Sequence, residues 1–177
     1  GRNTYSFDDS FAGNTSVHII HWKNEDSPSG AVKPFTANFG VGSFEGCKNL
    51  ETIVSNDHNL GSLDEEAVFN VGSAAFAGCT SLIMAGTGFG SNTGPLYSSI
   101  GSQAFFGCTG LTSLDFTVSG IREGAETIIG SQAFENCTGI TSINLPNTVT
   151  SIGSQAFTGC SNLETINIPF IGESATS

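Results

Sequence analysis

The chain has 177 residues, of which 38% are hydrophobic and only 12% are charged, and its formal net charge is −11. Such an acidic chain is not expected to bind nucleic acid, because it would release no counterions from a polyanion. No apolar run approaches the roughly 20 residues that a membrane-spanning helix needs, so we expect no membrane insertion. Gly, Ser, Thr and Asn replace the missing charges, and this composition suits turns and exposed strands.

An internal repeat organises the sequence. Residues 152–160 (IGSQAFTGC) recur almost letter for letter at 129–137 and 100–108, and more loosely at 71–79 and 39–47. Self-similarity of this kind indicates a stacked array in which each repeat forms one coil. The segment FAGNTSV at 11–17 aligns with FAGCTSL at 76–82, so we count six coils. Their equivalent anchor positions are Asn14, Cys47, Cys79, Cys108, Cys137 and Cys160.

The anchor residues predict a structural column. Five cysteines cannot all pair within one chain, and equivalent positions in stacked coils lie above one another. We therefore expect a ladder of buried free thiols that act as small apolar residues. Asn14 is expected to be buried in the same column, which makes Asn136 the better of two formal glycosylation sequons. No C-x-x-C pair or histidine cluster points to a metal, and we expect no cofactor.

A strand is predicted after each anchor. Apolar residues follow at fixed offsets, as in Leu163, Ile166 and Ile168, and the last of these alternate with polar residues. Stacked strands of this kind would form a parallel sheet. Val149 and Ile152 are expected to point inward, Gly153 to mark a tight bend, and the Ser-Gln-Ala-Phe segment to form a 3₁₀-like turn. The phenylalanine column is expected in the core, at Phe11, Phe44, Phe76, Phe105, Phe134 and Phe157.

The run IGSQAFTGCSNLETINIP at 152–169 resembles the BspA-like leucine-rich repeat family. The resemblance is strong over 100–169 and looser over 11–86. It implies a right-handed, β-rich leucine-rich repeat solenoid of about six coils, with one short parallel strand per coil and short 3₁₀-like turns. It also implies a surface protein used in attachment. We predict a single domain over 1–177, with a degenerate first coil (5–38), looped coils (39–128), regular coils (129–169) and a partial next coil (170–177).

Insertions are the first candidate for a binding site. The steps between successive anchors are 33, 32, 29, 29 and 23 residues, so all but the last step carry extra chain. The insertions fall at one place in the repeat, near 23–38, 54–70, 86–99 and 117–128, and we expect them to gather on one side of the solenoid. The alternative is surface variation without function. The candidate binding residues are Asp57, His58, Phe89, Asn92, Tyr97 and Glu123.

The exposed strand face is the second candidate. In the last three coils its predicted columns consist mainly of hydroxyl and amide side chains, and one column contains His21, Asp115, Asn144 and Asn167. Such a surface suits a protein or glycan ligand. We find no convergent nucleophile, base or acid for catalysis, so we predict that the protein is not an enzyme.

The sequence therefore favours an extracellular or cell-surface binding or adhesion module. Its expected partner is a protein or glycan surface. The alternative is a structural subunit that associates with itself end to end, because a solenoid must either cap its open ends or pair them. Neither end of the sequence is polar enough to read as a cap, and a piece cut from a longer repeat protein is equally compatible with such ends.

Overall fold

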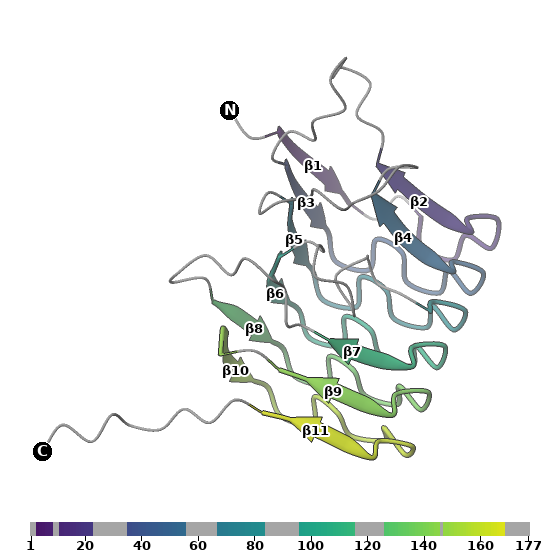
Figure 1. Cartoon of the computed structure of the whole chain (residues 1–177). Helices are drawn as coiled ribbons and strands as arrows, with labels where there is room; N and C mark the ends of the chain where they lie inside the picture. The colour runs from purple at the N-terminus through teal and green to yellow at the C-terminus, as the bar shows by residue number, and fades with distance from the viewer. Residues whose placement is uncertain are drawn as a thin grey trace, which may run out of the picture.

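A computed structural model describes residues 3–8, 11–22, 35–55, 67–83, 96–115, 126–145 and 147–168. The described residues form eleven strands, which stack coil upon coil from the N-terminal end at the top of Figure 1 to the C-terminal end at the bottom. This part of the chain contains no helix long and apolar enough to cross a membrane. The predicted β-rich leucine-rich repeat solenoid is confirmed.

Two rows of parallel strands run along the solenoid (Figure 1). The first row is one six-stranded sheet, here called sheet A. Its strands are β1 (Asn3–Phe7), β3 (Phe35–Phe39), β5 (Ala67–Val71), β6 (Leu96–Ile100), β8 (Thr127–Ile129) and β10 (Val149–Ile152). The second row, here called the strand row, contains a two-stranded and a three-stranded sheet. Its strands are β2 (Ile19–Trp22), β4 (Thr52–Ser55), β7 (Ser113–Asp115), β9 (Ser142–Asn144) and β11 (Thr165–Asn167).

Sheet A corrects the prediction of one strand per coil. The predicted strands are those of the strand row, and the strands of sheet A lie largely in residues that the sequence analysis assigned to insertions. In β5, Phe69 and Val71 are buried while Val68 and Asn70 are half-buried, which is the alternation of a strand with one face on the core. These segments form strands because each of them pairs in parallel with the equivalent segment of the neighbouring coil.

The segment that joins the two rows is a ladder of turns. In coil three, alternate N–H groups donate to carbonyls three residues back: Ala75 to Gly72, Ala77 to Ala74 and Cys79 to Phe76. The N–H groups between them donate to the next coil at 2.7–2.9 Å: Ala74 to Ser102, Phe76 to Ala104 and Gly78 to Phe106. A 3₁₀ helix could not share its donors in this way. The hydrogen bonds of a 3₁₀ turn, from the N–H of one residue to the carbonyl three residues back, are present. Residues in the left-handed conformation, such as Ala74 with φ 54°, separate them.

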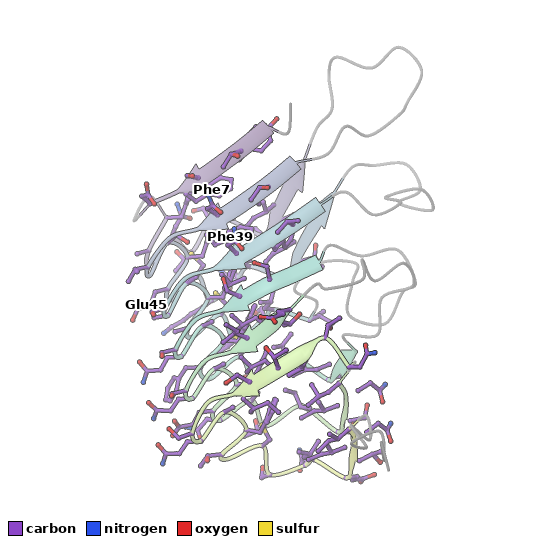
Figure 2. All side chains as sticks on the ribbon, turned by 90° about the vertical axis from the view of Figure 1, so that its left-hand side faces the viewer. Phe7, Phe39 and Glu45 are labelled. Atoms are coloured by element: carbon purple, nitrogen blue, oxygen red, sulfur yellow. The ribbon has the colours of Figure 1, made fainter. Side chains whose placement is uncertain are left out.

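The predicted phenylalanine column is confirmed as core. Its six rings form one continuous stack, with centroids 4.9–5.6 Å apart and ring planes within 10° of parallel. A second group of rings lies under sheet A, where Phe7 stacks on Phe39 at 5.5 Å. Figure 2 labels these two residues on adjacent strands, one coil apart. The six-ring stack couples each described coil to the next through the same contact.

The thiol ladder is also confirmed. All five cysteines are free and buried. Each Sγ lies 3.0–3.3 Å from the backbone carbonyl of the stacked phenylalanine in the preceding coil, to which it donates. Burial raises the pKa of Cys79 and of Cys137 to about 12, and it raises the pKa of the other three thiols as well. These thiols are structural donors and poor nucleophiles.

Two burial predictions are wrong, both at an end of the array. Asn14 is exposed, and its Oδ1 accepts hydrogen bonds from the N–H groups of Ser16 and Val17 in its own coil, at 2.8 and 3.0 Å. Its sequon is therefore no less accessible than that of Asn136, which is also exposed. Ile152 occupies the inward column but is 45% exposed, because no described coil follows it.

Candidate functional site

The strand row places the predicted polar columns in register. Asp115 pairs with Asn144, and Asn144 pairs with Asn167, so these backbone positions form one column across β7, β9 and β11. His21 pairs with Val54 at the N-terminal end of the same row. Between the columns, Leu114 and Ile143 are fully buried. The repeat spacing therefore predicted the register of these positions, and a role of their side chains in binding stays a prediction.

Hydrogen bonds between coils order the polar side chains. Asn167 donates from Nδ2 to Oδ1 of Asn144, which continues the column by a side-chain bond. Thr141 donates from Oγ1 to the carbonyl of Thr112 at 3.2 Å. Because the strands pair in register, this surface places amide and hydroxyl groups of neighbouring coils beside one another. Asn167 and Thr141 are exposed and Asn144 is half-buried, so a ligand can reach the rows from solvent.

The residues that directly precede the strands of the strand row form another column. Among its described members, only those near the two ends carry charge. At the N-terminal end, Nδ1 of His18 lies 3.6 Å from Oε1 of Glu51. At the other end the equivalent residue is Glu164, which is exposed. Side-chain exposures of 59% and 53% leave the His18–Glu51 pair in solvent.

Most of the predicted insertion residues cannot be placed. Asp57, His58, Phe89, Asn92 and Glu123 lie outside the described residues. The prediction that Tyr97 lies in an insertion loop is wrong, because its backbone belongs to β6 and pairs with Phe69 of β5. The stretches 23–34, 56–66, 84–95 and 116–125 also lie outside the described residues, and each precedes a strand of sheet A in the sequence. That they gather on one side of the solenoid stays a prediction.

A second polar ladder was missed. On the outer side of sheet A, Asn38 donates from Nδ2 to Ser6 Oγ at 3.4 Å, Asn70 donates to Asn38 Oδ1 at 2.8 Å, and Ser98 donates to Asn70 Oδ1 at 2.6 Å. The signal in the sequence was the alternation in FTANF at 35–39 and AVFNV at 67–71. These groups bond to one another, so they lock the register of sheet A. Within the described ranges, no three His, Cys, Asp or Glu side chains are grouped to hold a metal.

The fold and its core columns define a leucine-rich repeat solenoid. Residues 91–175 match the family model of the BspA type leucine rich repeat region, in six copies. This half of the chain belongs to the BspA-type leucine-rich repeat family, as its resemblance implied. None of the curated proteins matches the chain.

Solved structures of similar fold come from three bacteria. A leucine rich cell surface protein of Faecalibacterium prausnitzii is 22% identical, with a TM-score of 0.55 over 89% of this chain and 33% of its own. A leucine-rich repeat protein of T. pallidum is 22% identical, with a TM-score of 0.58 over 86% of this chain and 59% of its own. A leucine-rich repeat protein of Bacteroides ovatus is 23% identical, with a TM-score of 0.56 over 92% and 40%. The present chain thus spans between a third and three fifths of these proteins, and at this identity they show the fold alone.

Proposed function

We propose that this chain is a non-catalytic binding module that acts at a cell surface or outside the cell and recognises a protein or glycan surface. The observation that carries the proposal is the column of Asn144 and Asn167 with its neighbouring hydroxyl groups. These side chains lie in register on adjacent strands, and Ile143 and Leu145 on either side of Asn144 are buried. The bacterial cell-surface protein of similar fold supports the location.

The chemistry of the face sets the class of partner. Amides and hydroxyls can both donate and accept hydrogen bonds, which suits glycan hydroxyls and protein backbone. The formal net charge of −11 disfavours nucleic acid and anionic membranes. The stretches that return from the strand row to sheet A would add contacts at one rim of this face.

Paired variants test the strand face. Asn167→Lys changes an exposed residue of that face, and Ser151→Lys changes an exposed residue of β10 in sheet A, also in the last coil. The probes are an extracellular-matrix protein preparation and a glycan array, with thermal melts to verify folding. We expect Asn167→Lys to lower binding at least tenfold and Ser151→Lys to leave it unchanged. Equal binding by both variants and the parent would refute a role for the strand face.

The stretches outside the described residues need a separate test. Replacing 84–95 by a glycine-serine segment of equal length leaves β6 intact, whereas a deletion that reached 99 would remove most of that strand. Loss of binding in the replaced protein, with the melting temperature preserved, would place the contact in the insertions. Retained binding would leave the strand face as the only contact proposed.

Association through the ends of the solenoid is the second candidate. Ile152, Ile166 and Ile168 of the last coil are 45%, 48% and 66% exposed, whereas their counterparts in the preceding coil are buried. Such an apolar end suits another coil. A head-to-tail filament also requires the first coil of a second copy to fit against this end.

A further inference from the structure

Glycine is required where each coil after the first leaves sheet A. One glycine follows the strands β3, β5, β6, β8 and β10, at Gly40, Gly72, Gly101, Gly130 and Gly153. Each glycine donates its N–H to the strand-end carbonyl of the preceding coil at 2.7 Å. None of them has a positive φ, so turn conformation is not the reason for glycine.

The reason is the close approach of the preceding coil. A Cβ at these five positions would meet its nearest neighbouring atom at 2.3–2.7 Å, and real Cβ atoms essentially never come closer than 3.0 Å. At Gly101, Gly130 and Gly153 the atoms met are backbone atoms, which cannot turn aside. A coil therefore stacks on the coil before it only if it carries glycine at this position.

The first coil carries aspartate at this position. β1 pairs in register with β3, with Phe7 opposite Phe39, so Asp8 is the counterpart of Gly40. A coil placed before β1 in the repeat geometry would bring its backbone about as close to the Asp8 Cβ as the 2.3–2.7 Å found for the five glycines. The carboxylate would also lose water against that backbone. The N-terminal end therefore cannot receive a coil in the way that every other coil does.

At the opposite end, the described residues contain no such obstacle. Gln132, Phe134 and Asn136 donate their N–H groups to the last coil at 2.8–2.9 Å. The equivalent N–H groups of Gln155, Phe157 and Gly159 make no such bond within the described chain. Phe157 lies between these donors in the sequence, and among the described residues its ring stacks on Phe134 alone. Within the described residues, the last coil thus presents the N–H donors and the ring face on which a further coil would stack.

The first coil of a second copy would fit this surface in every respect but one. Its apolar positions Phe7, Phe11, Val17 and Ile20 are only partly buried, and by the repeat register they would face Ile152, Phe157, Leu163 and Ile166. The carbonyl of Ala12 corresponds to that of Glu45, which accepts from Gly13, and would receive the N–H of Gly159. His18 would lie beside Glu164, as it now lies beside Glu51. The obstacle is Asp8.

We propose that Asp8 is a gatekeeper that closes the N-terminal end of the solenoid against the C-terminal end of a second copy. Heterologous contacts that do not close into a ring build open filaments. One β-carbon at the first coil prevents this contact and leaves the coil's own packing on β3 intact. The proposal is independent of the strand face, and it is the opposite of the second candidate function, so the test below decides between the two.

The test compares three substitutions of Asp8 by light scattering on a concentration series. Asp8→Gly removes the Cβ, while Asp8→Ala and Asp8→Asn keep it and remove the charge. We expect the parent, Asp8→Ala and Asp8→Asn to keep the monomer mass of 18.2 kDa. Asp8→Gly is expected to at least double its average mass at the highest concentration reached. Adding Ile166→Lys to Asp8→Gly blocks the other half of the contact and should restore the monomer.

Each outcome decides the proposal. A monomeric Asp8→Gly variant that melts like the parent would overturn it. So would association of Asp8→Ala to the same extent as Asp8→Gly, because the charge and not the Cβ would then be the barrier. A parent protein that forms chains which Ile166→Lys dissolves would overturn it as well. Electron microscopy of the Asp8→Gly variant should show rods whose width is that of one solenoid.

Discussion

The phenylalanine stack predicts that a truncation costs more in the middle of the array than at its end. Phe105 is fully buried and stacks on Phe76 at 5.4 Å and on Phe134 at 5.2 Å. Phe157 is half-buried and stacks on Phe134 alone, at 5.6 Å. The two residues occupy the same place in the repeat, so the comparison isolates the effect of neighbouring coils.

The expected magnitudes follow from burial and from ring stacking on one side or on both. Truncation of a fully buried phenylalanine to alanine costs about 3–5 kcal/mol, and each well-placed aromatic pair contributes about 0.5–1.5 kcal/mol beyond its buried area. Because the Phe105 ring is stacked on both sides, Phe105→Ala should lie near the upper limit, at about 5 kcal/mol. The Phe157 ring is stacked on one side and buries less area, so Phe157→Ala should cost about 2 kcal/mol. Domains of this size are stable by about 5–15 kcal/mol, so the first change is severe.

Guanidinium denaturation followed by far-ultraviolet circular dichroism measures both costs. Phe105→Leu serves as the matched control, because it keeps most of the apolar volume, and it should cost clearly less than Phe105→Ala. A smaller slope of unfolding free energy against guanidinium concentration for Phe105→Ala would show that the array no longer unfolds as one unit and has separated at the fourth coil. This is expected when coils contact only their neighbours. Equal costs at positions 105 and 157 would refute the nearest-neighbour account of the stack.

Three further predictions concern the ladders. The pKa of Cys79 and of Cys137 is about 12 in the folded chain, above the ordinary 9.0, so the unfolded chain loses these protons first. Stability should therefore be intact below pH 9 and fall as pH rises from 9 towards 12, by up to about 1.4 kcal/mol per pH unit for each thiol. A Cys79→Ala, Cys137→Ala double variant should show a shallower fall in denaturation series across that range. Ala74→Gly relieves a left-handed alanine and should raise stability by about 0.5–1 kcal/mol, whereas Gly101→Ala should lower it by more than about 2 kcal/mol, both measured by chemical denaturation. Asn70→Ala removes the centre of the sheet A ladder and should cost about 1–2 kcal/mol, while Ser98→Ala at its end should cost less than about 1 kcal/mol.

The sequence was informative where one residue type recurs at one place in every coil. The phenylalanine and cysteine columns were predicted because each position makes the same contact with its neighbours, so the same residue suits all coils. Sheet A was missed because its strands differ from coil to coil: FTANF in β3 and LYSSI in β6 share little beyond alternation. The burial of Asn14 was wrongly predicted because periodicity says nothing about which coil lies at an end. Gly153 was predicted as a bend, but the close approach of the preceding backbone is what requires glycine there.

The division between repeated and varied positions also bears on function. Phenylalanine, cysteine and glycine recur because each contacts the adjacent coil, and a change there costs folding energy. The repeated contacts of the column that precedes the strands are backbone hydrogen bonds that any residue can supply, such as Glu51 N–H to His18 carbonyl and Ile83 N–H to Glu51 carbonyl. Its side chains accordingly differ in charge and polarity, from His18 and Glu51 through Ile83 to Thr112, Thr141 and Glu164. Because the fold does not fix these residues, they are where selection for a ligand can act, and variants of them should alter binding before they alter stability.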